Sequence, residues 1–225
     1  AVTTIPGWCG WYDKWTPGGA GTLIHIWYIS GNNVIWRSLD TATDTLGGAV
    51  TVFAGVSATQ LVMLSGAKMR GGNLLCVFTI DGGTEVGCYR SVDAGVNWAS
   101  RASPVEATQD IWWLQPGNYA DNQDDDLLFW DVSANELSLK VYDNSADSWA
   151  ETLVAASMIE AMPGIAGPQL AASVRASDGH LIVVAWNAYD AVGADLKCWD
   201  INGAGSITAK TNVVTDSDDS ILAGL

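Results

Sequence analysis

The stretch from Leu74 to Trp98, LLCVFTIDGGTEVGCYRSVDAGVNW, decides the fold of this chain. It begins with an apolar run of strand length that ends at Ile80, and the turn after this run contains a pair of glycines. A second segment, rich in strand-forming residues, follows from Val86 to Asp93. Two such segments joined by a short glycine turn predict an antiparallel β-hairpin.

The same hairpin recurs in four successive units. Its apolar first strand begins at Leu23, Leu74, Leu127 and Leu181, which are 51, 53 and 54 residues apart. One more strand is expected before each hairpin and one after it. The expected strands, unit by unit, are Trp8–Trp15, Leu23–Ile29, Val34–Asp40 and Val50–Phe53; Gln60–Ser65, Leu74–Ile80, Val86–Asp93 and Trp98–Val105; Asp110–Leu114, Leu127–Val132, Leu137–Asp143 and Trp149–Ala155; and Gln169–Val174, Leu181–Trp186, Leu196–Asn202 and Ile207–Val214.

A repeat of about fifty residues with four strands predicts a β-propeller, because a four-stranded sheet cannot bury both of its faces alone and radial packing of successive sheets does so. We therefore expect an all-β fold with residues 1–225 in a single propeller domain. The expected blades are 5–55, 58–106, 108–156 and 167–215, and residues 219–225 add a strand that either closes a four-bladed ring or begins a further blade. One short helix is expected from Glu151 to Met162. If the repeat is real, equivalent hairpin ends are occupied by Ser38, Ser91, Tyr142 and Asp200.

The end of the second hairpin carries a recognisable motif. Residues 91–98, SVDAGVNW, match the pattern S-x-D-x-G-x-x-W at its defined positions, Ser91, Asp93, Gly95 and Trp98. This segment resembles the Asp-box of sialidase-type (BNR) repeats. The resemblance implies a structural role, because Ser and Asp side chains bond turn amides, glycine permits a positive φ, and Trp packs under the hairpin. Weaker copies in the other units place at the Ser or Asp positions Ser38, Asp40, Asn144 and Asn202.

Two shorter resemblances also imply a propeller. Residues 140–149, together with the doublet Gly82-Gly83, are similar to a kelch repeat, and residues 198–200 look like the end of a WD-type blade.

The composition restricts the possible partners. The chain has 25 acidic and 10 basic residues, a net charge of −15 that repels phosphate backbones, so nucleic acid is not expected as a partner. No apolar run approaches the roughly 18 residues of a membrane-spanning helix, so no membrane insertion is expected. The chain begins at Ala1 without a leader, which we interpret as a processed chain or a fragment. An acidic, Trp-rich surface favours an extracellular, cell-surface or virion location.

No catalytic residue can be assigned from the sequence. Sialidase-like hydrolases, by resemblance, use an arginine triad, a Tyr–Glu pair and an acidic Asp. Arg37 and Arg90 recur just before the Asp-box site of successive units, which indicates a structural role. The other arginines are Arg70, Arg101 and Arg175. The histidines, interpreted as structural or surface residues, are His25 and His180.

We therefore expect a non-catalytic recognition or structural propeller of an extracellular or virion-surface assembly. Its partners would be a glycan or neighbouring protein subunits in an oligomer or larger assembly. The alternative is a sialidase-like glycoside hydrolase. Exposed Trp rings stack on sugars, and the candidates among the twelve tryptophans are Trp8, Trp11, Trp15, Trp112 and Trp113.

Two further predictions concern metals and disulfides. An acidic loop concentrates oxygen ligands suited to calcium, although a solvated acidic loop is the favoured interpretation; its residues are Asp121, Asp124, Asp125 and Asp126. No other cofactor is expected. Cys76 and Cys88 flank the second hairpin turn, so they either pair as a disulfide or remain buried thiols.

Overall fold

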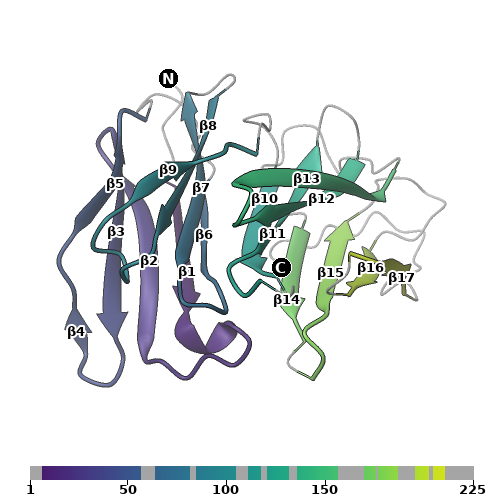
Figure 1. The fold of residues 1–225 in the computed structure, drawn as a ribbon, viewed down its shortest axis with the longest axis horizontal. Helices are drawn as coiled ribbons and strands as arrows, with labels where there is room; N and C mark the ends of the chain where they lie inside the picture. Colours follow the sequence, from purple (N-terminus) through teal and green to yellow (C-terminus); the bar gives the residue numbers. More distant parts are fainter. Residues whose placement is uncertain are drawn as a thin grey trace.

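The structure of the chain is a computed structural model, and it is all-β. Four antiparallel sheets follow one another along the sequence as the four blades of a β-propeller (Figure 1). The structure describes residues 7–56, 64–81, 85–104, 111–117, 121–131, 136–156, 170–175, 177–186, 196–202 and 205–210. The tail 219–225, predicted to close the ring or begin another blade, lies outside these residues.

Each blade is built from consecutive antiparallel strands. Blade 1 contains β1 (Trp8–Tyr12), β2 (Leu23–Ser30), β3 (Asn33–Asp40), β4 (Thr45–Leu46) and β5 (Val50–Ala54), the last two both pairing with β3. Blade 2 contains β6 (Leu64–Lys68), β7 (Leu74–Asp81), β8 (Glu85–Ser91) and β9 (Ala99–Arg101). Blade 3 contains β10 (Ile111–Pro116), β11 (Asp125–Asp131), β12 (Glu136–Asp143) and β13 (Ser148–Ala155). Blade 4 contains β14 (Leu170–Val174), β15 (Leu181–Trp186), β16 (Leu196–Ile201) and β17 (Ile207–Ala209).

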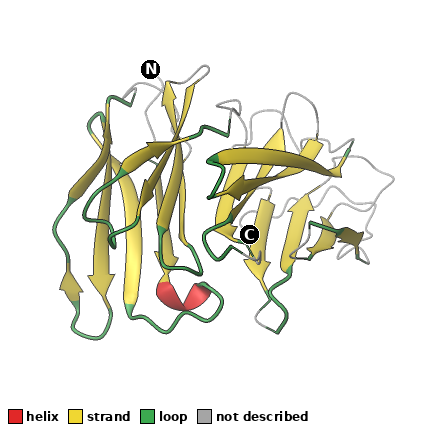
Figure 2. Ribbon diagram, viewed as in Figure 1, coloured by secondary structure: helices red, strands yellow, loops and turns green. Residues whose placement is uncertain are grey.

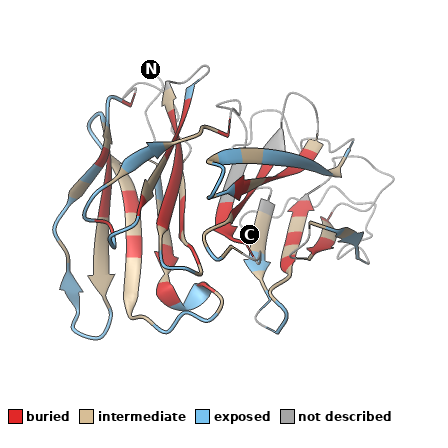
Figure 3. Cartoon of the chain, in the orientation of Figure 1, coloured by how far each residue is buried: buried red, intermediate tan, exposed pale blue. Residues whose placement is uncertain are grey.

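The first strand of each blade lies on the inside of the propeller. Strands β1, β6, β10 and β14 contact one another in chain order. Figure 1 places blades 1 and 2 on one side of the molecule and blades 3 and 4 on the other. The outermost strands β4, β9, β13 and β17 are largely exposed, as the pale blue segments of Figure 3 show. In blade 4 the second strand is buried more deeply than the first, because Leu181, Val183 and Ala185 of β15 are buried and no described side chain of β14 is.

The prediction of a short helix at Glu151–Met162 is wrong for the residues of this segment that the structure describes. Residues 151–155 belong to β13 and continue its antiparallel ladder with β12. The ladder satisfies the backbone hydrogen bonds of this segment, and this outweighs any helical preference. Figure 2 shows a single short helical turn in the described part of the chain, η1 (Asp13–Trp15).

Blades 1 and 2 pack through large aromatic side chains. Trp27 of β2 is fully buried and lies flat against Gly66 of β6, where an added Cβ would come within 2.7 Å of the indole. Phe53 of blade 1 packs against Phe78 of blade 2, with ring centroids 5.4 Å apart. The absence of a side chain at Gly66 thus lets the two sheets approach closely enough to bury Trp27.

Blade 3 is buried on both of its faces, because side chains alternate along its strands. Leu127 and Phe129 of β11 join the core that blade 3 shares with blades 1 and 2. Leu128, between them, packs instead with Leu139 and with the core residues of blade 4. The nearly continuous apolar run in this strand is therefore explained by a neighbouring blade on each side.

The four residues predicted at equivalent hairpin ends all lie on the third strand of their blade, near the same end: Ser38, Ser91, Tyr142 and Asp200. Their side chains do not share one orientation. Ser91 pairs with Leu74 and faces blade 1, whereas Asp200 pairs with Ile182 and faces away from blade 3. The repeat therefore holds for the strands but not for each residue along them.

Cys76 and Cys88 do not form a disulfide, and all four cysteines are free thiols. Cys76 lies opposite Tyr89 in the hairpin, whereas Cys88 lies opposite Val77. Because alternate residues of a strand point to opposite faces, the two thiols lie on opposite sides of blade 2. Burial raises the pKa of both thiols, so they stay protonated.

Candidate functional site

The turns that join the first strand of each blade to the second lie at one end of the propeller. We call this end the turn face. Its turns are residues 13–22, 69–73, 117–124 and 175–180, of which 118–120 and 176 are not described. The Thr16 hydroxyl donates to the Lys68 carbonyl of blade 2 at 2.7 Å, and the Gly71 amide donates to the Asn122 carbonyl of blade 3 at 2.7 Å. In Figure 1 the turns of blades 1 and 4 lie at the same lower edge.

The turn of blade 1 is fixed by the buried carboxylate of Asp13. Its Oδ1 accepts hydrogen bonds from Lys68 Nζ at 2.5 Å and from His25 Nε2 at 3.0 Å, and its Oδ2 accepts one from the Leu23 amide at 3.1 Å. Burial alone would raise the pKa of Asp13, but these hydrogen bonds outweigh burial and keep the pKa below its usual 3.8. Asp13 therefore stays charged and ties the turn to blade 2.

Trp15, the last residue of η1 in this turn, is 60% exposed. Its ring makes edge contacts with Trp11 and Tyr12, at centroid distances of 5.8 and 6.4 Å and interplanar angles of 88° and 84°. Trp11 itself is buried and donates from Nε1 to the Thr16 hydroxyl at 2.9 Å. Trp15 is thus an exposed indole held in one orientation, whereas Trp11 belongs to the core and cannot stack on a ligand.

The other predicted stacking residues differ in their placement. Trp8, at the start of β1, is 74% exposed. Trp112 and Trp113 lie on β10 opposite Phe129 and Leu128, but their side chains lie outside the described part of the structure. The structure therefore exposes Trp8 and Trp15, buries Trp11, and leaves the adjacent pair as a prediction.

The motif at the end of β8 forms the hydrogen bonds that its residue types predict. The Ser91 hydroxyl donates to Asp93 Oδ1 at 2.8 Å and accepts from the Gly95 amide at 2.8 Å. The two carboxylate oxygens of Asp93 accept from the backbone and side-chain N–H groups of Asn97 at 2.9 and 2.7 Å. Trp98 Nε1 donates to the Gly95 carbonyl at 3.1 Å. All of these contacts are internal to the turn, so the motif stabilises the fold.

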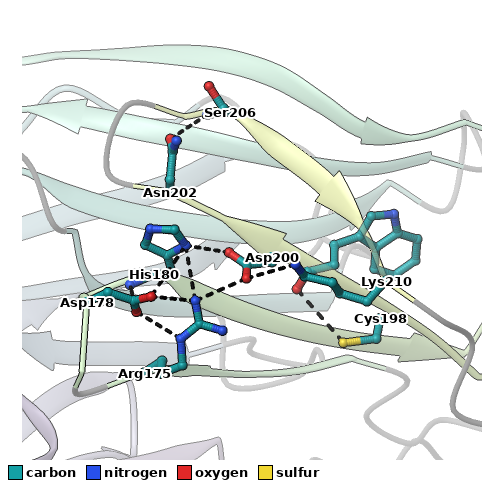
Figure 4. Close-up of polar contacts among 9 residues, drawn as sticks. Arg175, Asp178, His180, Cys198, Asp200, Asn202, Ser206 and Lys210 are labelled. Atoms are coloured by element: carbon teal, nitrogen blue, oxygen red, sulfur yellow. Dashed lines mark hydrogen bonds and ion pairs between the residues drawn. The ribbon is translucent and has the colours of Figure 1, made fainter.

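The weaker copies in the other blades use different residues for the same purpose. In blade 1, Asp40 accepts from the Ala42 amide at 2.9 Å, and Ser38 lies against Gly47. In blade 4, Asn202 accepts from the Ser206 amide at 2.9 Å (Figure 4), the same spacing of four residues as Asp93 and Asn97.

Blade 3 departs from the predicted copy at Asn144. The carboxylate of Asp143, one residue earlier, accepts from the amides of Ser145 and Ala146 at 2.8 and 2.9 Å. Asn144 instead accepts a hydrogen bond from Arg90 of blade 2. The turn in blade 3 is therefore stabilised by Asp143, and Asn144 links two blades.

Arg37 and Arg90 are not equivalent, contrary to the sequence interpretation. Trp36 faces blade 2, so its neighbour Arg37 points to the opposite side of blade 1, where its Nε donates to the Gly47 carbonyl at 2.9 Å. Arg90 points toward blade 3, where it bonds Asn144. A spacing close to the repeat length does not guarantee that two residues share a face, because blades differ in register.

In the described part of the structure, the aspartates of the acidic loop are not arranged around a common point. Asp125 and Asp126 are consecutive on β11 and point to opposite faces of blade 3. Asp121 Oδ1 accepts from the Gln123 amide at 2.9 Å, and Asp124 Oδ1 accepts from the Asn144 amide at 2.9 Å. Among the described residues, no group of three or more His, Cys, Asp or Glu side chains is arranged to hold a metal ion. These aspartates shape the loop and the start of the strand.

A polar cluster lies on blade 4, on the face of the sheet that points away from blade 3 (Figure 4). We call it the blade-4 cluster; its residues are Arg175, Asp178, His180, Asp200 and Lys210. Arg175 makes two hydrogen bonds to Asp178, from Nε at 2.9 Å and from Nη2 at 2.5 Å. The side chain of Asp200 is only 8% exposed and lies at the centre.

Three nitrogen groups converge on Asp200. His180 Nδ1 lies 2.6 Å from Oδ1, while Arg175 Nη2 and Lys210 Nζ lie 3.1 and 3.2 Å from Oδ2. The hydrogen bond from His180, followed by the one from Lys210, lowers the pKa of Asp200 despite its partial burial. Asp200 therefore remains ionised at neutral pH and fixes the three side chains around it.

Sequence reasoning did not select this cluster. Its members are spread from the β14–β15 turn to the residue after β17, and no short motif connects them. The signal was available in the repeat: in the fourth unit, polar residues occupy the turn-face end of successive strands. Only the strand register shows that these polar side chains lie on one face of the sheet. It places Ile182 opposite Asp200, and His180 lies two residues before Ile182 on the same side.

No family model matches this chain, and no curated protein matches it. Solved structures do. AofleA from Arthrobotrys oligospora aligns with a TM-score of 0.59 at 11% identity over 94% of this chain and 57% of its own. A mutant of Aleuria aurantia lectin in complex with α-methyl-L-fucoside aligns with a TM-score of 0.54 at 12% identity over 94% of this chain and 64% of its own.

The third comparison is the NanB sialidase from Streptococcus pneumoniae, with a TM-score of 0.53, 13% identity, and coverage of 82% of this chain and 29% of its own. This chain thus spans less than two thirds of each of these proteins. The described residues contain no helix long and apolar enough to cross a membrane. At these identities the similarity concerns the architecture alone, and it shows that the chain has the β-propeller fold found in lectins and sialidases.

Proposed function

We propose that this chain is a non-catalytic glycan-recognition propeller and that Trp15 is its principal sugar-stacking residue. The observation that carries the proposal is an indole that is 60% exposed yet held by edge contacts to two other rings. Covering a large apolar ring that is exposed to water with a pyranose ring removes apolar surface from water and so lowers the free energy. Because the ring is already ordered, little conformational entropy is lost on binding.

The turn that carries Trp15 is suited to this role. Asp13, directly preceding Lys14 and Trp15, is anchored to blade 2 through Lys68, so the platform does not have to reorganise when a ligand arrives. Lys14 Nζ lies 5.6 Å from the centroid of the Tyr12 ring, next to the indole, and can donate to sugar hydroxyls. Trp8 is more exposed than Trp15 but has no ring contact with another described residue, so we assign it a secondary role.

The structural neighbours support this proposal at the level of architecture. One of them is a lectin whose structure contains a bound fucoside. We also propose that residues 91–98 are an Asp-box of the sialidase type, on the basis of the side-chain-to-turn hydrogen bonds of Ser91 and Asp93. The strong negative charge and the exposed tryptophans favour a place in an extracellular, cell-surface or virion assembly.

The first experiment is a glycan array with the wild-type chain, followed by titration calorimetry with methyl α-L-fucoside and the strongest array ligand. Trp15→Ala should weaken binding about 5- to 30-fold, the equivalent of roughly 1–2 kcal/mol of lost stacking. Trp8→Ala is the matched control, because it removes an indole that is even more exposed but is not held by other rings. It should weaken binding by less than about threefold.

A fluorogenic sialoside assay distinguishes the hydrolase alternative. Turnover by the wild-type chain would contradict the proposal, and so would an array without any bound glycan. Unchanged affinity in Trp15→Ala would leave glycan recognition standing but would move the site elsewhere.

A further inference from the structure

We propose that the blade-4 cluster is a second saccharide-binding site, separate from Trp15 and selective for uncharged, hydroxyl-rich sugars. Nothing in this inference uses Trp15, because the two sites lie on different blades and share no residue. It rests on the arrangement of donors and acceptors around Asp200 (Figure 4).

The cluster combines a buried centre with exposed side chains around it. The side chain of Asp200 is 8% exposed, whereas those of His180, Arg175 and Lys210 are 31%, 40% and 45% exposed. The opposite face of the same strand is core, because Trp199 and Ile201 pack toward blade 3. A rigid sheet thus supports a polar surface that solvent reaches.

Each exposed member retains hydrogen-bonding capacity after its contact with Asp200. Asp200 is ionised and can only accept, so the nearby Nδ1 of His180 must carry a proton, which in the neutral ring leaves Nε2 as an acceptor. Arg175 bonds its described partners through Nε and Nη2, which leaves Nη1 as a donor. Lys210 has three donor positions and one described partner.

This mixture matches the chemistry of sugar hydroxyls. A hydroxyl group both donates and accepts, and vicinal hydroxyls suit a planar guanidinium beside an imidazole acceptor. Asp178, 38% exposed, adds a carboxylate at the edge of the cluster. The side chains are already positioned by Asp200, so binding requires little ordering.

The charge balance of the cluster argues against an acidic sugar. Arg175 and Lys210 are balanced by Asp178 and Asp200. A bound carboxylate would compete with these two aspartates for the same cations. The net charge of −15 adds a repulsive field for anions. The site therefore favours neutral saccharides, in contrast to what the resemblance to sialidases suggests.

Two sugars that differ only at C6 test this selectivity. Binding of methyl β-D-galactoside and of its galacturonate counterpart is followed by NMR, using the backbone amide signals of blade 4 and the indole signal of Trp15. We expect shifts at residues 175–180 and 200–210 with galactoside, and at least tenfold weaker binding of galacturonate. The affinity for galactoside should be the same in about 50 mM and about 500 mM NaCl, because binding of an uncharged sugar neutralises no net charge.

Two substitutions separate binding from folding. His180→Asn keeps a side-chain N–H that can bond Asp200 but removes the Nε2 acceptor, and Arg175→Lys removes the planar fork. Each should weaken galactoside binding at blade 4 at least fivefold while the Trp15 signal still responds to its own ligand. Arg37→Lys is the matched control, since Arg37 lies in blade 1, away from the blade-4 cluster, and its Nε donates to the Gly47 carbonyl of its own blade. It should leave both responses unchanged.

The outcomes are distinguishable. Tighter binding of galacturonate, or binding that weakens with salt, would overturn the selectivity. Shifts at Trp15 without any at blade 4 for both sugars would overturn the second site and leave the proposed function intact. Shifts at blade 4 that are unchanged in both variants would also overturn the second site. Thermal unfolding checks that the variants are folded.

Discussion

At Gly95 two separate requirements coincide. Its φ of 92° lies in the left-handed region, and an added Cβ would overlap the Trp36 ring of the preceding blade. The residue therefore has to be glycine for its own turn and also for the packing between blades 1 and 2. Trp98, from the same motif, lies 6.3 Å from Trp36 by ring centroids, so two residues of the motif contact this indole.

Gly95→Ala should destabilise the protein by about 2–4 kcal/mol, because backbone strain and overpacking add. Urea unfolding followed by tryptophan fluorescence measures the loss. The control is Gly72→Ala, which also has a positive φ, 97°, but has no atom within 4 Å of the added Cβ. It should cost only about 1 kcal/mol. Equal losses in the two variants would show that strain alone matters at Gly95.

At the scale of elements, the junction between blades 1 and 2 depends on a buried imidazole. His25 on β2 is 1% exposed, bonds Asp13 through Nε2, and stacks on Trp36 with ring centroids 5.9 Å apart. Burial lowers the pKa of His25 from its ordinary 6.5, despite the opposing effect of Asp13. The folded junction therefore favours the neutral ring.

This junction should weaken as the pH falls below 6.5, the ordinary pKa of histidine. Below that pH the unfolded chain binds a proton that the folded chain resists, so stability decreases by up to about 1.4 kcal/mol per pH unit until His25 also titrates in the fold. Asp13, whose pKa is lowered from 3.8, contributes a further loss only in more acidic solution.

His25→Gln retains a donor for Asp13 without a group that titrates. Unfolding free energies measured from pH 7.5 to 4.5 should show a shallower slope for this variant than for the wild type. Parallel slopes would mean that His25 is not the group responsible.

At the scale of the whole molecule, the net charge of −15 opposes the compact state. The surface carboxylates are spread over all four blades, so their repulsion acts on the propeller as a unit. Within it, the buried clusters are continuous from blade 1 to blade 3 and from blade 3 to blade 4. We therefore expect the four blades to respond to ionic strength together.

Raising NaCl from about 10 to 300 mM should increase the unfolding temperature by about 2–4 °C, the equivalent of roughly 1 kcal/mol, because salt screens this repulsion. Differential scanning calorimetry measures the shift. CaCl2 at matched ionic strength is the control, and it should give the same increase. A larger increase with calcium would reveal a specific site and would contradict the arrangement of Asp121 to Asp126.

The sequence by itself determined the features that depend on residues close to one another in the chain. The hairpins, the repeat of about fifty residues and the turn at Ser91 to Trp98 follow from local alternation, glycine placement and side-chain bonds to nearby amides. The all-β propeller follows from them, because four-stranded sheets must share their faces. The acidic surface also needs no structure to be recognised.

The tertiary structure decided everything that depends on strand register and on the neighbouring blade. It placed Cys76 and Cys88, and likewise Asp125 and Asp126, on opposite faces, so the described residues contain neither the disulfide nor a group of calcium ligands. It buried Trp11 and exposed Trp15, and it collected residues from Arg175 to Lys210 around Asp200. A shift of one residue in register reverses a side chain, and local sequence does not encode which blade lies beside it.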